Sequence, residues 1–371
     1  MHKADDNYKE AVKFFVNAAR IEPNNQNILR DLSWLQVQLR DLPGFLESRR
    51  KAIVLRPGLR ANWVGYIAAN YFSEKYEDTI SLIDQLKAAW ATEQEPYEES
   101  ELYMFQNKCL EKQGLYTEAL EHLNKFDAKI VDKLSLKTKR AELFMRTQQW
   151  GNAMTVWVQM VEEQPDNYRF HCGLQACALQ IEDPALLDEL FALKKLDLPS
   201  SVLVLTEEQK QSILDVYAKE YKFCSGTASK RIVLTLLSGA AFEAKLDQYL
   251  RKRISSAVPS LYSDIVSIVT KTVTQSGQER RVILSDMSSF KEHSTVQLTV
   301  RLVRGYIASL KKCNKFSEDA SESESGTNVE QAPSSLLWSL FLLCHFEELC
   351  GNSEAALELI NECIFHTPTA P

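Results

Sequence analysis

Histidine and cysteine side chains are the residues of this sequence that could bind a metal ion. They gather in two short groups, His171 with Cys172 and Cys177, and Cys344 and His345 with Cys350. Structural zinc sites use closer, paired ligands such as Cys-x2-Cys, and none of the eight cysteines forms such a pair. We therefore predict no metal site, reduced and buried thiols, and histidines at helix surfaces.

Carboxylates are a second group that could do chemistry, and they cluster at Glu95, Glu98, Glu99 and Glu101. Such a run is typical of a solvated helix face. No nucleotide-binding glycine loop, G-x-S-x-G motif or H-E-x-x-H motif occurs, and the 12 glycines are scattered singly. The sequence therefore predicts no catalytic residue and no cofactor bound by this chain.

Short basic clusters leave two interpretations open. The clusters are Lys230-Arg231, Arg251-Lys252-Arg253, Arg280-Arg281 and Lys311-Lys312. One interpretation is a patch that contacts RNA or an acidic ligand. The other is that such cations end helices, where they interact favourably with the helix dipole. The net charge of −7 argues against a broad nucleic-acid face, although it allows a local basic patch.

Helices must position these side chains, because residues that make turns are scarce. Only 12 glycines and 11 prolines occur among 371 residues, and helix formers fill the intervals. No apolar run approaches the ~18 residues that cross a bilayer, and the charged start of the chain is unlike a secretory signal. We predict an all-α, soluble, intracellular protein and assign it to the cytoplasm.

A 34-residue repeat organises the first half of the sequence. Tyr116-Thr-Glu-Ala119 and Trp150-Gly-Asn-Ala153 stand 34 residues apart, as do Pro23 and Pro57. An aromatic residue, a small residue and a closing proline at this period are typical of tetratricopeptide repeats. The small residue lets two antiparallel helices approach closely. We predict a right-handed α-α superhelix, a solenoid of helix pairs whose repeats start near Gln26, Arg60, Ser100, Leu134 and Tyr168.

The repeat pattern predicts four regions. Residues 1–181 form a tetratricopeptide array whose first repeat is incomplete, and residues 182–312, where the pattern decays, form divergent helical hairpins. Residues 313–334 include the Ser-rich acidic run Ser321–Ser325 and form a flexible loop. Residues 335–371 restore a repeat that is truncated at its C-terminal end. We interpret the chain as an internal piece of a longer array, because solenoids normally end in polar caps.

Large apolar and basic side chains recur at the positions of first helices that face the concave groove of such a superhelix. The residues that we expect on a partner-binding surface are Trp34, Tyr71, Phe72, Met104, Lys108 and Arg146. Aromatic residues flanked by cations suit the capture of a helical or extended partner. The alternative is that these side chains only pack within the superhelix.

Four stretches carry a resemblance to a known family. They are Ile28–Leu42 (ILRDLSWLQVQLRDL), Leu55–Tyr66 (LRPGLRANWVGY), Ser100–Asn107 (SELYMFQN) and Gly114–Leu123 (GLYTEALEHL). These stretches resemble the auxiliary subunit of the N-terminal acetyltransferase A (NatA) complex. The resemblance covers essentially the whole chain, strongly from Tyr8 to Asn167, and residues 272–294 depart from the family pattern.

The resemblance implies a non-catalytic tetratricopeptide scaffold. Such a subunit binds the catalytic acetyltransferase subunit and helps anchor it at the ribosome for co-translational N-terminal acetylation. Acetyl-CoA is then expected on the catalytic partner, and neither a membrane nor specific DNA binding is expected. The family's inositol-phosphate pocket is expected beyond Pro371.

Three other classes of protein fit the sequence less well. A tetratricopeptide adaptor for a chaperone would pair Lys with Asn one turn later on a first helix, whereas the chain has pairs such as Arg30/Trp34 and Met104/Lys108. An RNA-reading helical repeat would need a basic concave face. The acetyltransferase itself would need a glycine-containing acetyl-CoA loop, which we do not find.

Overall fold

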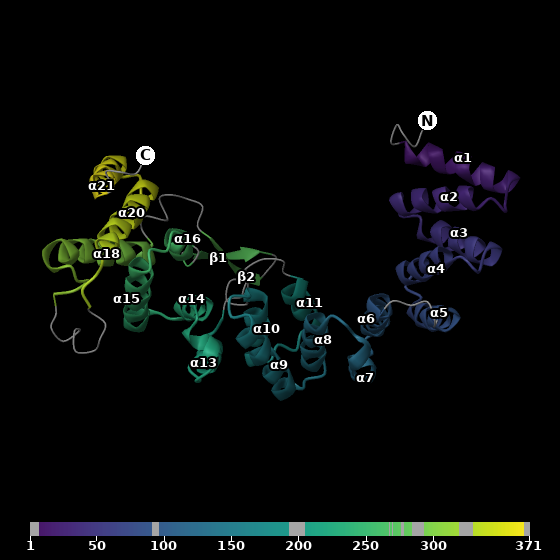
Figure 1. Ribbon diagram of the computed structural model, residues 1–371, viewed down its shortest axis with the longest axis horizontal. Coiled ribbons are helices and arrows are strands. Elements are labelled where there is room, and N and C mark those ends of the chain that lie inside the picture. The colour runs from purple at the N-terminus through teal and green to yellow at the C-terminus, as the bar shows by residue number, and fades with distance from the viewer. Residues whose placement is uncertain are drawn as a thin grey trace. The chain divides into compact units, whose positions relative to one another are not determined.

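The computed structural model describes residues 7–90, 96–192, 205–266, 268, 270–275, 278–283, 293–318 and 329–366. The chain divides into two compact units, Met1–Val156 (unit 1) and Trp157–Pro371 (unit 2) (Figure 1). Among the described residues, no helix is both long enough and apolar enough to cross a membrane.

Unit 1 is built of helices in which each helix packs on the next one along the chain, from α1 to α8. The helices are α1 (Tyr8–Ile21), α2 (Gln26–Gln38), α3 (Leu42–Leu55), α4 (Arg60–Phe72), α5 (Tyr76–Ala89), α6 (Pro96–Lys112), α7 (Tyr116–Phe126), the 3-10 helix η1 (Asp127–Lys129) and α8 (Lys133–Arg146). The following helix, α9 (Trp150–Glu163), contains the division between the two units.

The predicted register of the repeat is confirmed by these helix starts. Helices α2, α4 and, in unit 2, α10 (Tyr168–Ala178) begin at the predicted Gln26, Arg60 and Tyr168. Helix α8 begins at Lys133, next to the predicted Leu134, whereas α6 begins about one turn before the predicted Ser100, at Pro96. The small residues Ala119 and Ala153 are fully buried. Their lack of a long side chain lets the paired helices approach closely, as the pattern predicts.

A side chain at the same repeat position also holds two helix pairs together. In unit 1, the buried Asn107 donates a hydrogen bond from Nδ2 to the carbonyl oxygen of Ala119, at 2.6 Å. In unit 2, the Cys344 Sγ donates to the carbonyl oxygen of Ala356, at 3.3 Å. Both bonds join residues 12 apart, so the C-terminal helix pair repeats the geometry of the N-terminal array.

The turns between paired helices use backbone with positive φ. Arg40, Glu74, Gly114 and Gln148 have φ values of 56°, 59°, 75° and 57°. Each follows a first helix directly, and the first two stand 34 residues apart, as do the last two. The left-handed conformation ends one helix and redirects the chain into the next.

Unit 2 contains helices of the decayed repeat and one β-hairpin. Its helices are α10 (Tyr168–Ala178), α11 (Pro184–Ala192), α13 (Glu207–Tyr217), the 3-10 helix η2 (Lys222–Ser225), α14 (Thr227–Leu236), α15 (Gly239–Ser255), α16 (Leu261–Val266), α18 (Ser294–Cys313), α20 (Pro333–Leu349) and α21 (Ser353–His366). The all-α solenoid class is confirmed by this helical architecture.

The β-hairpin is a local departure from the expected helical hairpins of residues 182–312. Strand β1 (Thr270–Gln275) pairs antiparallel with β2 (Gln278–Ile283), with Thr270 opposite Ile283. The strands are rich in Thr, Val and Ile, and β-branched residues favour extended backbone over helix. Residues 319–328, which hold the acidic run Ser321–Ser325 of the predicted loop, lie outside the described residues.

Candidate partner-binding surface

Three of the predicted partner-binding residues lie together in unit 1, where the end of α4 meets α6. The Tyr71 ring centroid lies 5.8 Å from that of Phe72, and the Lys108 Nζ lies 5.4 Å from the Tyr71 centroid. A cation over an aromatic face is attracted by the ring quadrupole. Phe72 is 52% exposed and Tyr71 is half-buried, so this cluster offers an apolar surface with a cation beside it.

The sequence reasoning missed two rings that support this cluster. The Tyr71 centroid lies 4.9 Å from that of Phe105 on α6 and 5.7 Å from that of Tyr76 at the start of α5. Burial raises the pKa of Tyr71, while the nearby Lys112 ammonium acts in the opposite direction. Tyr76 could have been found from the register, because Tyr116 and Trp150 also begin second helices.

Trp34 lies on another first helix and is the most exposed of the predicted residues with a large apolar side chain. Its exposure is 56%, although its neighbours Ser33 and Leu35 on α2 are buried. Val64 on α4 is also 49% exposed. Exposed apolar side chains therefore occur on two consecutive first helices, as the interpretation of a concave partner-binding groove predicts.

Met104 and Arg146 are more deeply engaged within unit 1. Met104 packs against the hydrophobic cluster that includes Tyr103 and Leu123. The Arg146 guanidinium lies 5.2 Å from the Tyr116 ring centroid and donates a long hydrogen bond to the Tyr116 hydroxyl, at 3.5 Å. Both are half-buried, so Trp34, Phe72 and Lys108 are the exposed members of the predicted surface and Tyr71, Met104 and Arg146 are its half-buried members.

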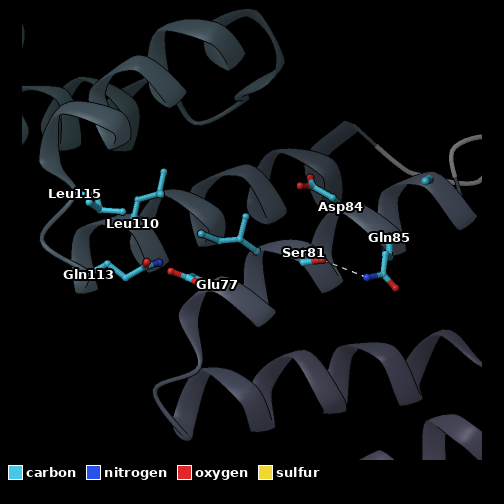
Figure 2. A pocket seen from close by; sticks show the side chains of 9 residues that line it. Glu77, Ser81, Asp84, Gln85, Leu110, Gln113 and Leu115 are labelled. Carbon is cyan, nitrogen blue, oxygen red and sulfur yellow. Dashed lines mark hydrogen bonds between the residues drawn. The ribbon is translucent and has the colours of Figure 1, made fainter.

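A shallow hollow of about 600 Å³ lies elsewhere in unit 1, on the second-helix side of the repeat. Figure 2 shows Glu77, Ser81, Asp84 and Gln85 on α5, with Leu110, Gln113 and Leu115 gathered beside Glu77. The Gln85 side-chain nitrogen donates to the Ser81 hydroxyl, at 3.3 Å.

The Asp84 carboxylate of this hollow is already held by hydrogen bonds. Burial alone would raise the pKa of Asp84, but hydrogen bonds from Gln106 and Lys87 lower it overall. That carboxylate is therefore ionised and already bound at neutral pH. Across the residues that the structure describes, no group of three or more His, Cys, Asp or Glu residues is placed to hold a metal ion.

The histidine and cysteine group around His171 is part of the core of unit 2. His171 is fully buried, which corrects the expectation that the histidines lie on helix surfaces. Its Nε2 donates to the Pro165 carbonyl oxygen and its Nδ1 accepts from the Tyr217 hydroxyl, both at 2.8 Å. Burial lowers the pKa of His171 and raises that of Cys177 to about 12, which keeps both groups neutral.

Comparison with known proteins identifies relatives along the whole chain. A family model described as "N-terminal acetyltransferase A, auxiliary subunit" matches residues 97–371. Over 374 residues, the chain is 30% identical to the N-terminal acetyltransferase A complex auxiliary subunit NAA15 of Arabidopsis thaliana, with 100% of this chain and 36% of that protein covered. It is also 30% identical to the human N-alpha-acetyltransferase 16, NatA auxiliary subunit, with 100% of this chain and 37% of that protein covered.

The chain also matches solved structures, of which one shares the fold over nearly its whole length. The structure of Naa15/Naa10 bound to HypK-THB matches with a TM-score of 0.70 at 21% identity, over 99% of this chain and 47% of that chain. At this identity the match shows a common helical-repeat architecture. The chain spans a little over a third of the length of the curated relatives that it matches.

Proposed function

This chain belongs to the family of NatA auxiliary subunits, and we propose that it acts as a non-catalytic scaffold that binds the catalytic acetyltransferase subunit of such a complex. The observation that carries the proposal is the exposure of large apolar side chains on consecutive first helices, Trp34 on α2 and Phe72 on α4. Buried aromatic anchors commonly dominate protein interfaces, and rings of this kind supply them.

The wider role that we propose follows from family membership. The chain would help to hold the catalytic subunit at the ribosome, in the cytoplasm, for co-translational acetylation of nascent N-termini. Acetyl-CoA would be bound by the catalytic subunit, so this chain alone should give only background turnover of an Ala-starting or Ser-starting peptide with acetyl-CoA. Turnover well above background without a second subunit would contradict the scaffold role.

The partner-binding surface is tested by a paired substitution. Trp34→Ala combined with Phe72→Ala should weaken capture of the catalytic subunit roughly 1,000-fold, because two anchor residues that each contribute about 2 kcal/mol contribute about 4 kcal/mol together. Phe14→Ala is the matched control, since the Phe14 ring is 58% exposed but lies on α1, a second helix, and so outside the proposed surface of first helices. Equal affinity of the paired variant and the wild type would remove this surface from the interface.

Tyr71 calls for a separate measurement because it also supports unit 1. Tyr71→Ala removes a half-buried ring that contacts Phe105 and Tyr76, so the melting temperature should fall even if no partner binds there. An unchanged affinity in the folded fraction would assign Tyr71 to stability alone. A lowered affinity at a temperature where the variant is fully folded would place it in the interface.

A generic tetratricopeptide adaptor for a chaperone or another protein is the second candidate. Exposed Trp34 and Phe72 would serve any partner with a complementary apolar face. The two candidate functions can be distinguished by isolating the tagged chain from cells and identifying the partner that is present in equal amount. A stoichiometric acetyltransferase subunit would support the NatA scaffold, and a stoichiometric chaperone would support the adaptor. Sedimentation of the tagged chain with ribosomes at moderate salt tests the ribosome contact.

A further inference from the structure

Two of the basic clusters in the sequence meet at a cavity of about 660 Å³ in unit 2. Lys230 comes from α14, and Lys245, Lys252 and Arg253 come from α15. None of the cavity's described lining residues is an Asp or a Glu. In a chain whose net charge is −7, three lysines around one cavity, beside an Arg253 that pairs with Asp264 outside the lining, form a local positive site.

The three lysines have no carboxylate partner among the described residues within ion-pair distance. Burial lowers the pKa of Lys230, and the neighbouring Lys252 and Lys245 ammonium groups lower it further. Like charges that crowd together without a counter-charge raise the free energy of the empty site. An anion that bound between them would relieve this repulsion.

Arg253 and the start of α14 add unsatisfied donors to the same cavity. The Arg253 Nε is buried without a hydrogen-bond acceptor among the described residues, while its terminal nitrogens reach Thr227 and Asp264 at 3.4 Å. Thr227 is the first residue of α14 and lines the cavity, and no side chain caps that helix. Uncapped backbone N–H groups at a helix start are suited to bind oxyanions.

The walls of the cavity favour a small ligand over a polymer. Leu214, Leu234, Leu237 and Tyr249 form an apolar and aromatic lining beside the cations. Cavities of this size typically enclose most of a small molecule. A single-stranded RNA would instead follow an open basic groove with aromatic platforms along it.

We propose that this cavity between α14 and α15 binds a small molecule that carries two or more phosphate groups, held by Lys230, Lys245, Lys252 and Arg253. The phosphates could belong to an inorganic chain or to a phosphorylated organic molecule, because both present the same oxyanions to the lysines. The apolar lining would contact the organic part of a phosphorylated organic molecule.

The proposal is tested by titrating the full 371-residue chain with inorganic tripolyphosphate and with ADP, with orthophosphate as the single-phosphate reference. We expect tripolyphosphate or ADP to bind at least about tenfold more tightly than orthophosphate, and to weaken as salt is raised. Tighter binding of ADP would point to an organic ligand, and tighter binding of tripolyphosphate to an inorganic one. Failure of both to bind would overturn the proposal.

Charge-removing variants locate the binding. Lys230→Gln with Lys252→Gln should weaken the better probe about 100-fold, since a hydrogen bond to a charged group contributes about a tenfold change in affinity. Lys219→Gln with Lys222→Gln is the matched control, because these exposed lysines lie close in sequence but do not line the cavity. Equal losses in both variants would show non-specific attraction and overturn the site.

Two further measurements keep the test decisive. The Lys230/Lys252 variant should melt at an unchanged or higher temperature, because it removes repulsion between like charges. Lys245→Gln, which leaves that pair intact, should alone weaken binding about tenfold. If single-stranded oligouridylate binds more tightly than either probe and is not displaced by tripolyphosphate, the cavity is an RNA contact and the small-ligand proposal is wrong.

Discussion

The two units bury their apolar side chains over different distances along the chain. In unit 1 the two clusters seen among the described residues are local, for example the one formed by Ile67, Ile83 and Leu86. In unit 2 one cluster of the described residues extends from Leu234 to Cys363, and α20 packs on α15, α16 and α18. The comparison teaches that a strict repeat gives stability through neighbours, as in a one-dimensional array, whereas a decayed repeat is stabilised by long-range packing.

Buried charge occurs in both units, since Lys139 on α8 pairs with Glu111 on α6 and with the buried Glu142 in unit 1, but the network of unit 2 draws on more cations. In unit 2 the Asp264 carboxylate on α16 is almost fully buried and accepts hydrogen bonds from Arg231 on α14 and from Tyr249 and Arg253 on α15. In unit 1 several ion pairs, such as Lys13–Glu10 and Arg50–Glu47, lie within one exposed helix turn. Exposed pairs of that kind contribute little to stability, while the Asp264 network links elements distant in sequence.

Phe346→Ala should give the largest effect and test the cooperativity of unit 2. Phe346 is fully buried in the long cluster, so its loss should destabilise the unit by about 3–5 kcal/mol. Hydrogen exchange should quicken together in α15, α18 and α20, because these helices share the cluster. Faster exchange confined to α20 would break the comparison.

Leu123→Ala is the corresponding core substitution in unit 1. Leu123 is fully buried in the cluster that joins α6, α7 and α8, and the expected loss is about 2–5 kcal/mol. Because the packing is between neighbours, faster hydrogen exchange should be limited largely to these three helices and leave α2 and α3 protected. Uniform loss of protection over unit 1 would show that the array unfolds as one body.

Gly173→Ala tests close packing at the start of unit 2. A Cβ at Gly173 would lie 2.5 Å from the fully buried Trp157 ring, so the substitution should cost about 1–3 kcal/mol. Gly305→Ala is the matched control, since a Cβ there meets nothing within 4 Å and the residue lies inside α18. That control should stabilise the protein by about 0.5–1 kcal/mol. Urea unfolding of both variants measures the difference.

His122 should give the smallest effect, through its protonation. Burial lowers its pKa to about 4, aided by the nearby Lys87, and its Nδ1 is buried without a partner in the described part of the chain. The unfolded chain, with a histidine pKa near 6.5, therefore binds the proton more readily. The contribution of His122 to stability is complete above about pH 6.5 and declines as the pH falls toward 4.

The variant His122→Phe should flatten this part of the pH profile of the urea midpoint, measured between pH 7 and pH 4.5. His171 in unit 2 is also buried, but both of its ring nitrogens are hydrogen-bonded, and the variant keeps it. Any pH dependence that His171 contributes is therefore the same in the wild type and the variant. An identical pH slope in the wild type and the variant would show that His122 titrates normally in the folded chain.

Much of the fold could be predicted because the repeat depends on contacts between helices that are adjacent in the sequence. The spacing of Trp150, Ala153 and Trp157 requires only that one helix meets its neighbour, and it predicted the starts of α2, α4 and α8 to within a residue, although α6 begins about one turn earlier than predicted. The burial of His171 could not be predicted in this way, since its partner Tyr217 lies 46 residues away. The meeting of Lys230 with Lys245 and Lys252 depends likewise on how α14 and α15 pack.

For the candidate partner-binding surface, the sequence predicted which residues lie on first helices but not how exposed each side chain is. Positions on first helices identified Tyr71, Phe72 and Lys108 as neighbours, because α4 and α6 are consecutive first helices in the register. The degree of exposure was not encoded in those positions. Met104 and Arg146 occupy equivalent places, but the surrounding rings cover them in part. Their contribution to partner binding stays a prediction.

The left-handed turns between paired helices bear on how this solenoid could tolerate heat. Three of the four turns in unit 1 place Arg40, Glu74 or Gln148 at positive φ, a conformation that costs an ordinary residue about 1–2 kcal/mol. Glycine adopts it without that penalty, although it also gains freedom in the unfolded chain. A thermotolerant version could therefore be built by changing the turns alone, while every helix face that meets a neighbour or a partner keeps its natural side chains.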